Sequence, residues 1–101
     1  AEQQLRRAVD LAPRQAGRLL DLAKFLARQG RHQESDAAFQ QAARIEPASP
    51  RVLFERANTY IRTKRKIDEA RLLLKQYLAS PLTPDDPSRE EAEKLLKQAG
   101  G

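Results

Sequence analysis

Three prolines, Pro13, Pro47 and Pro81, recur at an interval of 34 residues along the 101-residue chain. Between the first two, apolar residues recur at steps of three and four, stop at Gly30 and then resume. This spacing predicts two amphipathic helices joined by a short turn. Because a constant interval in this range is typical of stacked helical repeats, it constrains the fold more than any other feature of the chain.

The interval divides the chain, which we treat as a single domain, into four segments. They are the second helix of a truncated repeat (1–13), a complete repeat (14–49), a repeat with one inserted residue (50–81), and a linker with a closing helix (82–101). The insertion is inferred from a change of register, because Leu53 matches Leu19 at 34 residues whereas Leu74 matches Phe39 at 35. The turn that contains it, residues 63–66, has also lost its glycine.

Two sites combine a capping side chain with a proline at the first helical position. They are Ser49-Pro50 and Asp86-Pro87. A side-chain oxygen at the first site satisfies a free N–H group, and proline is preorganised for the first turn. The sequence therefore predicts helices that begin at Pro50 and at about Pro87, the second of them closing the array and ending near Ala99.

The pattern resembles the tetratricopeptide repeat, a family of 34-residue helical hairpins. The segment Ala16–Ser49 carries the best match, through Leu19, Leu22, Ala23, Leu26, Gly30, Phe39, Ala42 and Pro47. The resemblance implies an all-α fold, a right-handed superhelical array of antiparallel helix pairs (an α-solenoid) with a C-terminal capping helix. In such arrays the first helices of successive hairpins line a concave groove that holds peptide segments of partner proteins.

Three residues depart from the family pattern. Ser35 stands where alanine is usual, Arg56 where an apolar residue is expected, and Tyr77 where a small residue is expected. We expect Arg56 to lay its aliphatic stem along the core with its charged head in solvent or paired. We expect the bulk of Tyr77 to be accommodated because the closing helix, rather than another hairpin, packs against it.

The side chains offer little for catalysis. The chain has no Cys and one His, and the repeat places that residue, His32, as a half-buried packing residue at the start of a second helix. Without a nucleophile–base pair or a His–Cys cluster, we expect neither an enzyme nor a cofactor or metal site. We interpret Asp85 and Asp86 as turn and capping residues rather than as cation ligands.

The remaining signal is a pair of matching stripes on the two first helices. A shift of 34 residues converts Leu20, Lys24 and Arg28 into Phe54, Asn58 and Arg62, so each stripe runs apolar, polar, basic. We expect the two apolar residues to anchor an apolar side chain of a protein or peptide partner while the polar ones hold its carboxylates or carbonyls. The predicted peptide-binding residues are Leu20, Lys24, Arg28, Arg51, Phe54, Asn58 and Arg62.

Alternative interpretations of the surface remain open. The stripes are also compatible with ordinary solvated helix faces. Of the net charge of +5, residues 48–80 contribute 8 − 3 = +5, and a basic run (Arg62, Lys64, Arg65, Lys66) at the enlarged turn suggests nucleic-acid binding as an alternative function. The apolar face of residues 2–12 suggests self-association as a homodimer. No apolar run is long enough to span a membrane, and the absence of Cys leaves the compartment undetermined.

Overall fold

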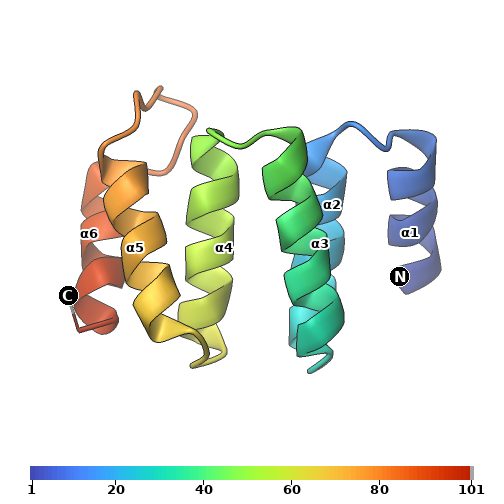
Figure 1. The fold of residues 1–101 in the computed structure, drawn as a ribbon, viewed down its shortest axis with the longest axis horizontal. Helices are drawn as coiled ribbons and strands as arrows, with labels where there is room; N and C mark the ends of the chain where they lie inside the picture. The colour runs from blue at the N-terminus through green and yellow to red at the C-terminus, as the bar shows by residue number, and fades with distance from the viewer. Residues whose placement is uncertain (101) are drawn as a thin grey trace. The chain divides into compact units, whose positions relative to one another are not determined.

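The computed structural model describes residues 1–100, and within that range it contains six α-helices and no β-strand. The predicted all-α class is therefore confirmed (Figure 1). The chain divides into two compact units, Ala1–Ala48 and a second that begins at Ser49. None of the helices in residues 1–100 is long and apolar enough to cross a membrane.

The first unit consists of three helices. They are α1 (Glu2–Leu11), α2 (Ala16–Arg28) and α3 (His32–Ile45). Helices α2 and α3 form the antiparallel hairpin, and α1 packs beside α2 (Figure 1). The two hairpin helices approach closely where Ala23 faces Ser35, both buried. Small side chains at these positions permit the close packing that the sequence predicted.

The turn between α2 and α3 depends on Gly30, which has a φ of 77°. The N–H of Arg31 donates to the carbonyl of Leu26 at 2.9 Å, and the N–H of Gly30 donates to that of Ala27 at 3.0 Å. This pair of bonds is the Schellman motif, which satisfies carbonyl groups left free at a helix end and favours glycine at the left-handed position.

The second unit also consists of three helices. They are α4 (Pro50–Arg62), α5 (Ile67–Leu78) and α6 (Arg89–Gln98). As predicted, α4 begins at Pro50, and the Ser49 hydroxyl accepts a hydrogen bond from the N–H of Val52 at 3.4 Å. Helices α4 and α5 form a second antiparallel hairpin, and α6 packs against both of them (Figure 1).

The turn between α4 and α5 repeats the Schellman motif without a glycine. The N–H of Arg65 donates to the carbonyl of Tyr60 at 2.9 Å, and the N–H of Lys64 donates to that of Ile61 at 3.1 Å. Lys64 thus occupies the position of Gly30 and has a φ of 55°. The inserted residue brings Lys66, with a φ of 48°, to the N-cap of α5. The turn therefore holds two lysines in a backbone conformation that costs L-residues free energy.

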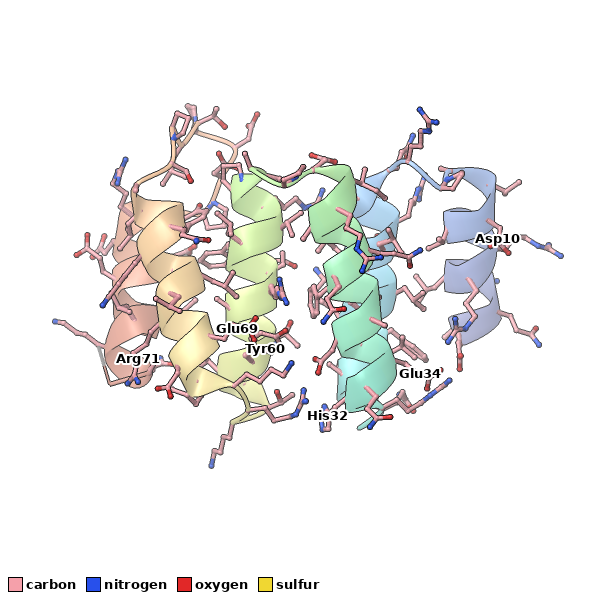
Figure 2. The ribbon with its side chains drawn as sticks, in the orientation of Figure 1. Asp10, His32, Glu34, Tyr60, Glu69 and Arg71 are labelled. Atoms are coloured by element: carbon pink, nitrogen blue, oxygen red, sulfur yellow. The ribbon has the colours of Figure 1, made fainter. Side chains whose placement is uncertain are left out.

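The unusual residues Arg56 and Tyr77 are both accommodated in the second unit. Arg56 donates from Nε to the Tyr60 hydroxyl at 3.0 Å and from Nη2 to Glu69 at 3.3 Å. Figure 2 shows Tyr60 and Glu69 close together on α4 and α5. Tyr77 is buried and donates its hydroxyl proton to the Pro87 carbonyl at 2.5 Å. Of the two expected environments for the head of Arg56, solvent or a partner, the structure shows a partner. The bulk of Tyr77 is covered at the entry to α6.

The start of the closing helix differs from the prediction. Helix α6 begins at Arg89 rather than Pro87, and its N-cap is Ser88, whose hydroxyl accepts from the N–H of Glu91 at 3.2 Å. Asp86 instead accepts from the N–H of Thr83 at 2.9 Å. A side chain that binds inside its own turn is not available to a helix end, so the capping role passes to the next hydroxyl residue.

Arginines from both α5 and α6 fasten the closing helix. Arg71 of α5 donates to the carbonyl of Ala99, the residue that ends α6, at 2.9 Å and pairs with Asp68. Arg89 of α6 donates to the carbonyl of Leu78, the last residue of α5. Each helix thus supplies a cation to the carbonyl end of the other, where the partial negative charge of the helix dipole lies.

Candidate functional site

The stripe predicted on α2 is only partly exposed. Leu20 is 1% exposed and belongs to the core. Lys24, one turn further on, is half-buried, and Arg28, the last residue of α2, is exposed. The positions accessible to a partner on this helix are therefore the polar and basic ones.

The stripe predicted on α4 has the same exposure pattern. Arg51 is exposed, Asn58 is half-buried, and Arg62 is exposed as the last residue of the helix. Phe54 is only 8% exposed, and its ring centroid lies 5.2 Å from that of Tyr77. The aromatic side chain therefore belongs to the core of the second unit.

Leu20 and Phe54 are thus not exposed anchors, and that part of the prediction is wrong. The reason on α2 is that more than one face is covered, since Leu19, Leu20, Leu22 and Ala23 are all buried. Two adjacent buried residues widen the apolar arc beyond the single stripe that the spacing indicated. The binding role of the other five predicted residues, Lys24, Arg28, Arg51, Asn58 and Arg62, stays a prediction.

A small cavity of about 140 Å³ lies at the Arg51 end of α4. The cavity lies between the start of α4 and the linker that precedes α6. It is lined by Arg51, Phe54, Glu55, Asp85, Asp86 and Pro87. The cavity therefore combines one arginine with three carboxylates beside a buried ring. Within residues 1–100 no group of three or more His, Cys, Asp or Glu side chains has a metal-binding arrangement.

A second cavity, of about 180 Å³, lies in the first unit between α1, α2 and α3. Its lining combines apolar residues of the hairpin with a charged pair, and consists of Arg6, Leu22, Leu26, Glu34, Ala37, Ala38 and Gln41. The sequence prediction did not include it, because Leu22 and Leu26 were interpreted as core residues alone. The one sequence feature that could have indicated this cavity is the pair of small adjacent residues Ala37 and Ala38 on α3, which leave space at the surface of the helix.

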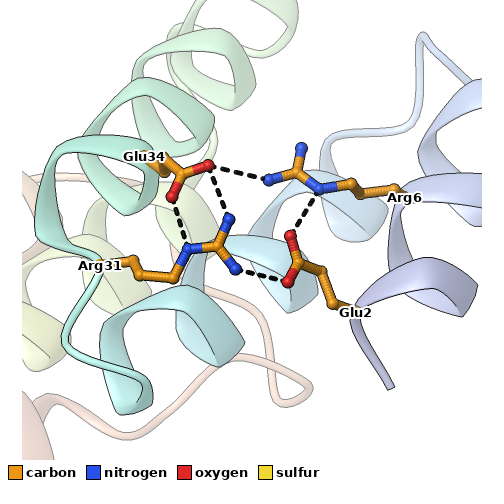
Figure 3. Close-up of polar contacts among 4 residues, drawn as sticks. All are labelled: Glu2, Arg6, Arg31 and Glu34. Atoms are coloured by element: carbon orange, nitrogen blue, oxygen red, sulfur yellow. Dashed lines mark hydrogen bonds and ion pairs between the residues drawn. The ribbon is translucent and has the colours of Figure 1, made fainter.

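Four charged side chains join α1 to the start of α3 (Figure 3). Glu2 accepts from Nε of Arg6 at 2.9 Å and also from Arg31. Glu34 accepts from Nε of Arg31 at 2.5 Å and from Arg6 at 3.2 Å. Each carboxylate therefore lies between two guanidinium groups, and the network connects α1 to the hairpin through alternating charges.

The network shifts the pKa of its members in the direction that favours charge. Hydrogen bonds from Arg31 and then Arg6 lower the pKa of Glu2 from 4.5 to about 2. The bonds from Arg31 also lower the pKa of Glu34, and its two carboxylate partners raise the pKa of Arg31 above its usual value. All four side chains remain substantially open to solvent, so the pairs are screened by salt.

His32 is half-buried at the start of α3, as predicted. Its Nδ1 atom is buried and has no hydrogen-bond partner within the described residues. The half-buried position of the ring agrees with its interpretation as a packing residue.

The basic turn between α4 and α5 has a mixed environment. Arg62 and Lys64 are exposed. Lys66 lies with Nζ 5.6 Å from the ring centroid of Tyr60 and 4.0 Å from Oε2 of Glu69. The turn therefore places cations both in solvent and over a buried aromatic ring.

A scan of protein-family models found no family that matches this chain, and a search of curated protein sequences found no match.

Proposed function

We propose that this chain is a protein-interaction module whose hairpins are of the tetratricopeptide type, stacked as a right-handed superhelical array. Its activity is to bind an acidic peptide segment of a partner protein along the first helices of the hairpins. Support for the repeat comes from two hairpins with equivalent buried small residues and the same Schellman turn at matching positions. Support for recognition comes from the side chains that these helices leave accessible.

The observation that carries the proposal is the repeated exposure pattern of α2 and α4. Each helix ends in an exposed arginine, Arg28 or Arg62, and each has a half-buried polar residue one turn earlier, Lys24 or Asn58. Arginine presents a planar fork of donors that fits a carboxylate with two parallel hydrogen bonds. A partner that carries carboxylates therefore matches the accessible positions better than an apolar one.

The burial of Leu20 and Phe54 changes the expected character of the binding. Without apolar anchors, charge provides most of the attraction, and exposed charge pairs are weak and sensitive to salt. We therefore expect a dissociation constant on the order of micromolar or weaker at low salt. Several such modules or binding segments in one assembly would strengthen the interaction.

Charge reversal tests this function. The measurement is the fluorescence anisotropy of a labelled peptide rich in Glu and Leu, titrated with the protein and with its Arg28→Glu/Arg62→Glu variant. The matched control is Arg7→Glu/Arg14→Glu, which changes the net charge equally at exposed residues outside the stripes. We expect the first variant to lose at least about tenfold in affinity, because each charge-assisted hydrogen bond contributes on the order of 1.5 kcal/mol or more. Equal losses in both variants would reduce the effect to net charge and refute the proposal.

Self-association is a second candidate, favoured by the exposure of α1. No residue of α1 is buried, and Leu11 is 79% exposed. An apolar helix face in this condition is a site at which a second copy can pack. Sedimentation of the protein and of its Leu11→Glu variant tests this candidate. A concentration-dependent dimer that the substitution abolishes would support it, and a monomer at all concentrations would refute it.

A further inference from the structure

We infer that the turn between α4 and α5 is a contact site for the phosphate backbone of double-stranded nucleic acid, independent of base sequence. The site consists of four cations within five residues, Arg62, Lys64, Arg65 and Lys66. The site shares Arg62 with the stripe on α4, but the inference does not depend on the proposed peptide binding, because its test uses Lys64 and Lys66, which lie outside the stripes.

The first argument is the charge balance around the turn. The nearest carboxylates in sequence, Asp68 and Glu69, already have partners, since Asp68 pairs with Arg71 and Glu69 pairs with Arg56 and Lys66. Lys64 is exposed, and no ion pair of it is recorded within residues 1–100. Lys66 thus shares the carboxylate of Glu69 with Arg56, whereas the charges of the exposed residues Arg62 and Lys64 are not cancelled by these two acids.

The second argument is the backbone of the turn. Lys64 has a φ of 55° at the position where the first hairpin has Gly30, and Lys66 has a φ of 48°. A glycine would adopt this conformation at a lower cost. A charged residue held in a costly conformation indicates that the side chain has a use, as strained residues concentrate at functional sites.

The third argument concerns the kind of partner. Tyr60, the aromatic residue beside the turn, is 1% exposed and lies beneath Lys66 and Arg56, so it cannot stack on a base. Residues 62–66 contain Thr63 and four cations but no apolar side chain that could hold a peptide. A surface of this composition attracts a partner by charge density alone, and duplex nucleic acid has the regular dense charge that suits it.

The test compares the protein with two variants of equal net charge. One is Lys64→Gln/Lys66→Gln, and the matched control is Arg7→Gln/Arg14→Gln, at exposed residues of the first unit. The probe is a labelled random-sequence DNA duplex, and binding is measured by anisotropy over a salt series. If all four cations contact phosphates, the logarithm of the binding constant falls with the logarithm of salt with a slope of about −3 to −4.

We expect the turn variant to bind about tenfold more weakly or worse at low salt, with a slope that is shallower by about 2, one for each lost phosphate contact. The control is expected to retain the original slope. A turn variant that binds like the original protein, or a control that loses as much, would overturn the inference. Polyglutamate that binds with the same dependence on Lys64 and Lys66 would also overturn it, in favour of an acidic protein partner.

Two further measurements distinguish a loss of phosphate contacts from a change in the fold of the variant. The unfolding midpoint of each variant, followed by circular dichroism, shows whether the variant is folded and about as stable as the original protein. A Lys64→Gly variant removes one charge while it keeps the left-handed backbone, so we expect its slope to be shallower by about 1. An unchanged slope in this stably folded variant would count against phosphate contact by Lys64.

Discussion

The hydroxyl group of Ser35 donates a hydrogen bond of 2.8 Å to the carbonyl oxygen of Ala23. This bond crosses the closest approach of α2 and α3, where both residues are buried. A polar group in such a place costs free energy unless it is paired. The hydrogen bond therefore explains how a serine is tolerated at a position where the sequence pattern favours alanine. The close approach of the two helices explains why a larger side chain would not fit there.

Substitutions of Ser35 test the packing of this hairpin. We expect Ser35→Ala to change the free energy of unfolding by at most about 1 kcal/mol, because it removes one hydrogen bond but leaves the helices at the same distance. We expect Ser35→Leu to destabilise by about 1–3 kcal/mol or more, because it forces the helices apart. Urea denaturation measures both. Equal stability of the two variants would contradict the close approach.

The two Schellman turns permit a reciprocal test. Lys64→Gly should stabilise the protein by about 1 kcal/mol, since it removes the cost of a left-handed L-residue at the price of some unfolded-state entropy. Gly30→Ala should destabilise by about 1 kcal/mol, and for a conformational reason alone, because nothing lies within 4 Å of the added Cβ. Thermal unfolding of both variants checks the signs. A destabilised Lys64→Gly variant would show that the lysine side chain stabilises the turn.

The charge network predicts an acid-sensitive attachment of α1. The pKa of Glu2 is about 2 in the folded protein, against an ordinary value of 4.5 that the unfolded chain is expected to show. The contribution of Glu2 to the free energy of unfolding is therefore present above pH 4.5 and is lost as the pH falls toward 2. Glu34, whose pKa is also lowered, adds to the same loss. We expect amide hydrogens of α1 to exchange faster at pH 2.5 than at pH 5, relative to those of α2, after correction for the intrinsic rates.

The Arg31→Gln variant provides the control for this network. It removes the arginine whose hydrogen bonds lower the pKa of both carboxylates most, so we expect the pKa of Glu2, measured by carboxyl NMR titration, to move toward 4.5. The protection of α1 in the variant should then differ little between pH 5 and pH 2.5. An unchanged pKa of Glu2 in this variant would mean that Arg31 does not form its hydrogen bond to Glu2 when the protein is in solution.

Tyr77 predicts a loss of stability at alkaline pH. Burial, followed by the charges of Asp86 and Glu91, raises the pKa of Tyr77 above 10. The folded state thus keeps the proton where the unfolded state releases it, and the stability from this group is present below pH 10 and lost as the pH rises through the folded-state value. The Tyr77→Phe variant should lack this contribution to the loss of stability at alkaline pH. At pH 7 its free energy of unfolding should be lower by about 1 kcal/mol, because the hydrogen bond to the Pro87 carbonyl is removed. Denaturation at pH 7 and pH 11 measures both effects.

The sequence predicted the helices well because their boundaries depend on local interactions. The start of α4 at Pro50 and the end of α2 before Gly30 follow from one capping residue and one left-handed position. The start of α6 was misplaced for a local reason as well, since Asp86 has two competing roles. The sequence cannot decide whether such a side chain binds its own turn or the next helix.

The candidate site was less predictable because exposure is a tertiary property. The positions of Lys24, Arg28 and Arg62 were assigned correctly to accessible or half-accessible faces. Phe54 was not, because the ring of Tyr77, which belongs to a different helix, covers it. The network of Glu2 with Arg31 was also missed, since the spacing of 29 residues between them has no periodic signature.

Chemical-shift mapping of a bound acidic peptide tests the central claim most directly. In a titration of the ¹⁵N-labelled protein, we predict that the shifted amide signals gather on α2 and α4 around Lys24, Arg28, Asn58 and Arg62, and that added salt reverses the shifts. Shifts confined to other helices, or no shifts at millimolar peptide and low salt, would contradict recognition of acidic segments by the first helices of the hairpins.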